Sequence, residues 1–256
     1  MKKTLFVFAT LFTLITTTVS LAQTPTPTPQ FSRVQVVKLN PGMNHEWQKF
    51  YQAEVLPALK KGGVKQSSVW RVIQGDVRQF VIISPLESWA QLDEPGALGK
   101  ALGGEAAQAL TTKQSRFFAE WHTHILAGRP ELSIAPTSTD APKLGVAAKT
   151  IVTPGRAPEW VKGVKENLMP IAQKIGVKGW LTGQVVLGGD PNEFRSLLLF
   201  DSYGDIGKFM AAYGKTAAEL KLSPAPPAGV VVQSEFLVAR YVPELSICPE
   251  PQKAAK

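Results

Sequence analysis

The sequence lacks several features that would assign a function directly. Its single cysteine, Cys248, allows no internal disulfide. The chain contains no P-loop, no Gly-x-Gly-x-x-Gly turn, no Gly-x-Ser-x-Gly nucleophile motif and no cysteine pair. No apolar run after residue 22 is long enough to span a bilayer. The fold must therefore be held by its core. Because no motif identifies catalytic residues, the sequence leaves open whether the protein is an enzyme.

The N-terminal residues predict export. Lys2 and Lys3 precede an apolar run that extends to Leu21, and small residues, Ser20 and Ala22, precede Gln23. This pattern is typical of a secretory signal peptide over residues 1–22, followed by a Thr-Pro spacer over residues 23–30. A retained membrane anchor is disfavoured because no basic stop-transfer segment follows. We expect an exported protein, periplasmic or secreted, with no integral membrane segment after cleavage.

The charge of the chain is only mildly basic. The formal net charge is +8, and two of these charges, Lys2 and Lys3, leave with the predicted signal peptide. The remaining lysines are scattered, which is typical of a solvated surface rather than a nucleic-acid patch. We therefore expect no nucleic-acid partner.

An internal repeat organises the rest of the sequence. The segment that begins at Asn40 aligns with the segment that begins at Thr153, and both halves end in Pro-Glu-Leu-Ser-Ile. Chance does not align rare Trp, Pro and Gly residues together. The matched residues include Pro41/Pro154, Gly42/Gly155, Trp47/Trp160, Pro57/Pro170 and Gly63/Gly176. The alignment predicts a first unit over residues 31–134, a linker over 135–142, a second unit over 143–247 and a polar tail over 248–256.

Both units have the same predicted order of elements: strand, helix, two hairpin strands, helix and strand. In the first unit, we expect strands over 33–39, 67–73, 80–84 and 117–126, with a helical region over 88–113. In the second unit, we expect this helical region to be shorter and interrupted by the proline-rich segment 223–229. The predicted fold class is α+β, with two tandem ferredoxin-like β-α-β-β-α-β units whose antiparallel sheets face each other as an intramolecular pseudo-dimeric α/β barrel. We expect a monomer, and the sequence does not decide whether the monomers assemble into larger oligomers.

Several phrases of the sequence resemble the dimeric α/β-barrel superfamily, particularly its NIPSNAP-type and antibiotic-biosynthesis-monooxygenase-type branches. These phrases are the strand, Pro-Gly and helix opening at 36–42, EVLPALKKGGVK from Glu54, SPLESWAQLD from Ser84 and FDSYGDIGKF from Phe200. The resemblance covers nearly all of the predicted mature chain. It implies the fold but no single activity, because the superfamily includes cofactor-free monooxygenases, haem-dependent enzymes and isomerases.

Two histidines are candidates for chemistry. His122 and His124 are two residues apart in a predicted strand, so both face the same side, together with Glu120. Such a pair can bind a divalent metal or haem iron. The alternative is that they are polar residues on an exposed or cavity-facing strand, and the other histidine, His45, is far away in sequence.

Glu54 and several aromatic residues predict a ligand site in the first unit. Glu54 falls within the apolar stripe of the first helix, although it could instead lie at the edge of the stripe and reach solvent. Pro57 and Pro170 cannot donate to the helix and should loosen it at this level. The predicted ligand-binding residues are Trp47, Tyr51, Glu54, Trp70, His122 and His124, although core packing also explains the aromatic ones.

These residues lead to a functional hypothesis and three alternatives. The first hypothesis is a small apolar molecule bound between helix and sheet of the first unit, without a cofactor. The second is a cofactor-independent monooxygenase-like enzyme in which Tyr51, Glu54 or His122 helps to deprotonate a phenolic substrate. The third is haem or metal binding through His122 and His124. The fourth is a structural or interaction module.

Overall fold

The computed structural model describes residues 30–138 and 140–248, and its eight strands form one closed barrel. The predicted signal peptide, nearly all of the Thr-Pro spacer and the tail beyond Cys248 lie outside these residues. The order around the barrel is β1-β3-β2-β8-β5-β7-β6-β4, and all neighbours are antiparallel. The strands are β1 (Phe31–Leu39), β2 (Ser68–Gln74), β3 (Gln79–Leu86), β4 (Phe118–Gly128), β5 (Leu144–Val152), β6 (Trp180–Leu187), β7 (Glu193–Phe200) and β8 (Val231–Tyr241).

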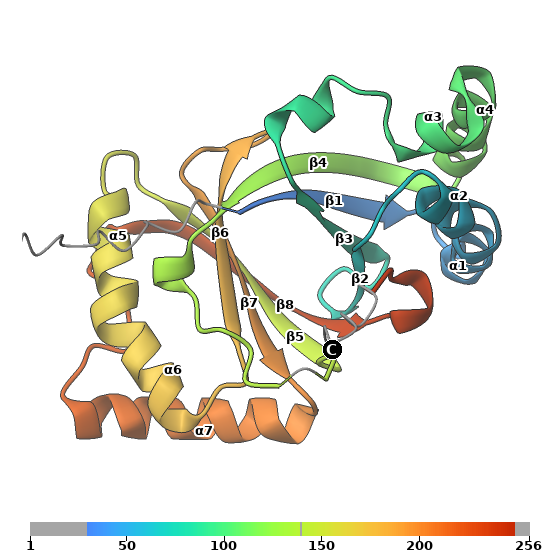
Figure 1. The fold of residues 1–256 in the computed structure, drawn as a ribbon. Helices are drawn as coiled ribbons and strands as arrows, with labels where there is room; N and C mark the ends of the chain where they lie inside the picture. The colour runs from blue at the N-terminus through green and yellow to red at the C-terminus, as the bar shows by residue number, and fades with distance from the viewer. Residues whose placement is uncertain (1–29, 139, 249–256) are drawn as a thin grey trace, which may run out of the picture.

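The two halves of the chain contribute equal parts of the barrel. β1 lies between β3 and β4, and β5 lies between β7 and β8. The halves meet where β2 pairs with β8 and where β4 pairs with β6, so the closed barrel leaves no free strand edge. Helices α1–α4 lie together on one side of the barrel, and α5–α7 lie elsewhere around it (Figure 1). The α+β class and the antiparallel barrel expected from the sequence are confirmed.

The first helix of each half is interrupted where the prolines predict it. α1 (Asn44–Phe50) and α2 (Leu56–Lys61) are separated by a π-helical turn at Tyr51–Val55. α5 (Ala157–Gly163) and α6 (Met169–Ile175) are separated in the same way at Val164–Leu168. Because Pro57 and Pro170 have no N–H to donate, the preceding turn widens instead of closing a regular α-helical bond.

The second helical regions differ from the prediction. In the first half this region is divided into a 3₁₀ turn at Trp89–Leu92, α3 (Ala97–Leu102) and α4 (Gly104–Ser115). In the second half α7 (Tyr203–Leu220) is a continuous helix whose Ser202 cap accepts a hydrogen bond from the Asp205 N–H at 3.1 Å. The proline-rich segment 223–229 follows this helix as a loop. The expectation that it interrupts the helix is therefore wrong, because the prolines lie beyond the last helical turn.

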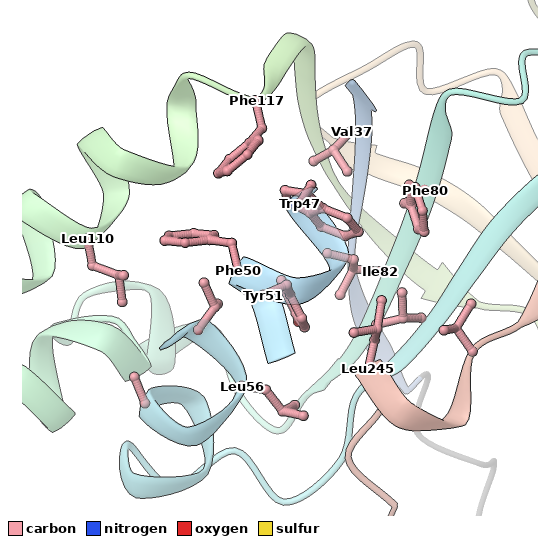
Figure 2. Packing of buried hydrophobic residues seen from close by; sticks show 14 of the residues in the cluster. Val37, Trp47, Phe50, Tyr51, Leu56, Phe80, Ile82, Leu110, Phe117 and Leu245 are labelled. Atoms are coloured by element: carbon pink, nitrogen blue, oxygen red, sulfur yellow. The ribbon is translucent and has the colours of Figure 1, made fainter. Parts of the chain in front are cut away.

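The space between the first helix and its sheet is filled by a packed core. Trp47 is fully buried, and its ring centroid lies 4.5 Å from that of Phe80 and 5.1 Å from that of Tyr51. Phe50 and Phe117 extend this cluster toward α4, as Figure 2 shows. A similar cluster around Trp160 and Phe194 covers the second half. No helix in the described part of the chain is long and apolar enough to cross a membrane.

Candidate binding site inside the barrel

The inner face of the barrel lines a cavity of about 860 Å³ that opens to solvent. All eight strands contribute to its lining. Successive residues of a strand face opposite sides of the sheet. In each strand, one set of alternate residues therefore packs against the helices, and the other set points into the barrel. On β1, for example, Val37 and Leu39 pack under the helices, whereas Val34 and Val36 line the cavity. The main cavity of the molecule is therefore shared by both halves.

One part of this cavity is apolar. Trp70, Leu199 and Ala239 form a small buried cluster inside the barrel, against which inward-facing residues of neighbouring strands pack. We call the part of this surface that lines the cavity the apolar wall. It consists of Trp70, Val81, Ile83, Leu197, Leu237 and Ala239. This wall can bury the body of a small apolar molecule.

Another part of the cavity is polar. Four residues form what we call the charged wall: His124, Lys149, Glu193 and Arg195. Lys149 and Arg195 are direct cross-strand partners on β5 and β7. The buried carboxylate of Glu193 accepts a hydrogen bond from Nε of Arg195, and its other oxygen lies 3.7 Å from Nζ of Lys149. Two cations therefore share one carboxylate. Burial of an ionised carboxylate is costly unless it is paired, and these two cations supply the pairing for Glu193.

His124, on β4 of the first half, contacts residues of the second half of the chain. Its Nδ1 lies 2.8 Å from the carbonyl oxygen of Gly188, and its Nε2 lies 3.2 Å from Nη2 of Arg195. Because the carbonyl only accepts and the guanidinium only donates, Nδ1 carries the proton and Nε2 accepts. Burial lowers the pKa of His124 below its usual value, and the charge of Arg195 lowers it further. The imidazole is thus held in one neutral tautomer.

This arrangement predicts a pH dependence of stability. His124 has a lower pKa in the folded chain than its ordinary 6.5, so the unfolded chain binds its proton more readily. The contribution of the neutral imidazole is complete above the unfolded pKa and is lost as pH falls toward and through the folded pKa. We expect wild type to lose more unfolding free energy between pH 7.5 and 5 than His124→Gln does. Urea titrations at both pH values test this, and equal losses would contradict it.

Three predicted ligand residues lie away from the cavity. Trp47 and Tyr51 are packed inside the core between helix and sheet, and burial raises the pKa of Tyr51 to about 12. Glu54 lies on the outer side of the helix, where its carboxylate accepts a hydrogen bond from Nζ of Lys113 at 3.4 Å. The expected site between the first helix and the sheet is therefore misplaced, because aromatic side chains fill that space and Glu54 reaches solvent.

The other predicted residues, Trp70, His122 and His124, do line the cavity. Sequence reasoning missed Lys149, Glu193 and Arg195, which come from the second half, whereas the predicted ligand site lay in the first. A signal existed, because charged residues alternate with apolar ones in the predicted strands there. That Lys149 and Arg195 are neighbours, however, follows only from the register in which β5 pairs with β7.

The histidines do not form a ready metal site in this arrangement. Nε2 of His122 lies 3.6 Å from one carboxylate oxygen of Glu120, and the other oxygen of Glu120 accepts a hydrogen bond from Nζ of Lys38 at 3.0 Å. Both ring nitrogens of His124 are engaged, so its Nε2 lone pair is not available to haem iron or another metal. Among the described residues, no group of three His, Cys, Asp or Glu side chains is placed to hold a metal ion. Metal or haem binding through His122 and His124 stays a prediction.

Comparison with known proteins identifies the fold but no family. No family model matches the sequence, and no curated protein matches it. An anthrone oxidase-like protein has a similar structure, with a TM-score of 0.57 and 12% identity over 89% of this chain and 97% of the other. A candidate monooxygenase from Fusobacterium nucleatum has a TM-score of 0.55 and 7% identity over 84% and 94% of the two chains. A candidate monooxygenase from Lactobacillus acidophilus has a TM-score of 0.53 and 10% identity over 83% of this chain and 94% of the other. These similarities show that the chain shares the α+β barrel fold of these proteins.

Proposed function

We propose that this protein binds a small, largely apolar molecule inside its barrel. The observation that carries the proposal is the cavity of about 860 Å³ with an apolar wall on one part of its surface. This volume lies in the range of small-molecule sites, which are typically apolar with a few polar groups that fix orientation. The proposal keeps the ligand class expected from the sequence and moves its site from the helix–sheet space to the barrel interior.

The same proposal includes a tandem origin and export. Two ferredoxin-like units that form an intramolecular pseudo-dimer are supported by the repeated sequence and by the equivalent positions of β1 and β5. A π-helical turn at the same place in both halves adds support. Export to the periplasm or medium rests on the N-terminal sequence alone. A NIPSNAP-type relationship rests on the phrases described above.

Filling the cavity tests the binding proposal. Ala147 lies on β5 and lines the cavity, so Ala147→Phe places a ring in the space that a ligand would use. We expect native mass spectrometry of the wild-type protein to detect a retained small molecule. The variant should lose at least about 90% of it, because steric exclusion removes the apolar contacts that hold the ligand.

The matched control is Ala119→Phe, the same change at an exposed position of β4. Ala119 does not line the cavity, and its variant should retain the wild-type ligand content. A fluorescent apolar probe added to both proteins gives a second measurement if the purified protein has lost its ligand. Equal binding by both variants would contradict a site inside the barrel.

A second candidate function is a cofactor-independent, monooxygenase-like activity. The structural similarity to an anthrone oxidase-like protein favours it. The cavity-lining His122 would be the group that removes a proton from a phenolic substrate, since Tyr51 and Glu54 lie outside the cavity. Oxygen uptake with a panel of phenols and quinols tests this candidate. Uptake that is absent in wild type, or unchanged in His122→Ala, would oppose the activity or the role of this histidine.

A further inference from the structure

The charged side chains that line the cavity are unevenly placed. Arg129, Lys149 and Arg195 are cationic, whereas Glu193 and Glu235 are the carboxylates. The charge of Arg129 is compensated outside this group, because its Nε donates to Glu131 at 2.7 Å. The remaining cations, Lys149 and Arg195, share the single carboxylate of Glu193, and His124 is held neutral.

Glu235 does not cancel this excess directly. It is the cross-strand partner of Lys149 on β8, but its side chain is exposed, and no ion pair within 4.0 Å joins it to another described residue. Glu193, in contrast, is buried and has both carboxylate oxygens engaged by cations. Within the charged wall, two positive charges therefore share one carboxylate, next to a cavity that is also lined by the apolar wall.

Hydrogen-bond donors are available beside this charge. The contacts of Arg195 to Glu193 and His124 use Nε and one N–H of Nη2, so both Nη1 hydrogens and the second Nη2 hydrogen remain. The ammonium of Lys149 carries three hydrogens and lies 3.7 Å from its nearest carboxylate oxygen. A ligand oxygen with negative charge would accept from both groups, and such charge-assisted bonds are stronger than neutral ones.

We propose that the ligand is a monocarboxylic acid, bound with its carboxylate at Lys149 and Arg195 and its apolar body against the apolar wall. This inference rests on the proposed binding function and adds the chemical class of the ligand. A single negative charge matches the excess of one positive charge within the charged wall. A doubly charged phosphate would leave one negative charge facing Glu193 inside the barrel, where a like charge is costly.

The test compares two probes of the same shape. 2-Naphthoate carries a carboxylate, and 2-naphthamide is a neutral counterpart in which an NH₂ donor replaces one acceptor oxygen, so their difference in affinity reports the need for a charged acceptor. By titration calorimetry at pH 7.5 and low salt, we expect naphthoate to bind the wild-type protein at least about tenfold more tightly. Raising the salt concentration should weaken naphthoate binding and leave naphthamide binding nearly unchanged.

Two variants should move the preference in opposite directions. Lys149→Met keeps the length of the side chain and removes its charge, so the preference for naphthoate should disappear while naphthamide affinity stays within about twofold. Glu235→Gln removes the nearby carboxylate and should strengthen naphthoate binding. Lys162→Met, a surface change of the same type on α5, should leave both affinities unchanged. Circular dichroism melting confirms that each variant is folded.

The possible outcomes separate the two proposals. Equal affinity of wild type for naphthoate and naphthamide, with loss of both in Ala147→Phe, would overturn the acid as ligand and retain the site inside the barrel. A naphthoate preference that persists in Lys149→Met would overturn the role of the charged wall. Binding of neither probe, together with ligand content that Ala147→Phe does not change, would overturn the proposed function itself.

Discussion

Replacing Trp47 by alanine is expected to lower the free energy of unfolding by about 3–5 kcal/mol. The side chain is fully buried among the helix and sheet residues of the first half, in contact with the rings of Tyr51 and Phe80. Truncation removes its apolar burial and leaves a cavity in a core that can collapse only partly. Urea unfolding followed by circular dichroism measures the loss.

Trp89→Ala is the matched control, because this indole is 44% exposed and its ring packs edge-on against Phe31. We expect it to cost less than about 1 kcal/mol. Trp47→Phe adds a second comparison. Nε1 of Trp47 has no hydrogen-bond partner among the residues that the structure describes, so phenylalanine loses volume but no hydrogen bond and should cost clearly less than alanine. A Trp47→Ala loss no greater than that of Trp89→Ala would contradict the packed core.

The elements of the barrel were predictable because local signals agree with the final structure. β1 and β5 end at Pro-Gly pairs whose glycines, Gly42 and Gly155, adopt positive φ angles of 81° and 83°. The helix prolines coincide with π-helical turns in both halves. The extent of α7 was not predictable from the prolines alone, since a helix of 18 residues fits completely between its Ser202 cap and the proline-rich loop.

The position of the cavity could not be read from hydrophobic periodicity. In β1, Val34 and Val36 face the barrel interior, whereas Val37 and Leu39 face the helices, so both sides of the strand are apolar. Closure of the barrel buries the inner face, and helices bury the outer face. The pattern therefore cannot show which face retains free space. That depends on the volumes of side chains that meet from strands distant in sequence.

The charged wall depends on the same long-range arrangement. Lys149 and Arg195 become neighbours only through the register of β5 and β7, and His124 reaches Arg195 from the other half of the barrel. Gly188 permits this approach, because a Cβ at this position would lie 2.3 Å from the carbonyl oxygen of Thr123. A sequence read along one unit at a time favours residues of that unit, such as Glu54, over a site assembled from both.

Replacing Glu193 by leucine is the second change with a large expected effect, a loss of about 3 kcal/mol of unfolding free energy. The substitution leaves Lys149 and Arg195 near each other without their shared carboxylate. The value is at the lower end for a broken buried ion pair, because the side chains of Arg195 and Lys149 retain 23% and 38% exposure. Urea unfolding at pH 7.5 and two salt concentrations measures it.

The control for this change is Glu159→Leu, which breaks an exposed ion pair with Arg156 whose atoms are 2.6 Å apart. Water screens that pair, so its loss should cost less than about 1 kcal/mol. In the Glu193→Leu/Arg195→Met double variant, one unpaired cation is removed together with the acid, and part of the lost stability should return. If Glu193→Leu is as mild as Glu159→Leu, or if the double variant is simply additive, the barrel interior is too well solvated for its charges to be coupled. The excess positive charge of the charged wall would then have no need of a ligand carboxylate.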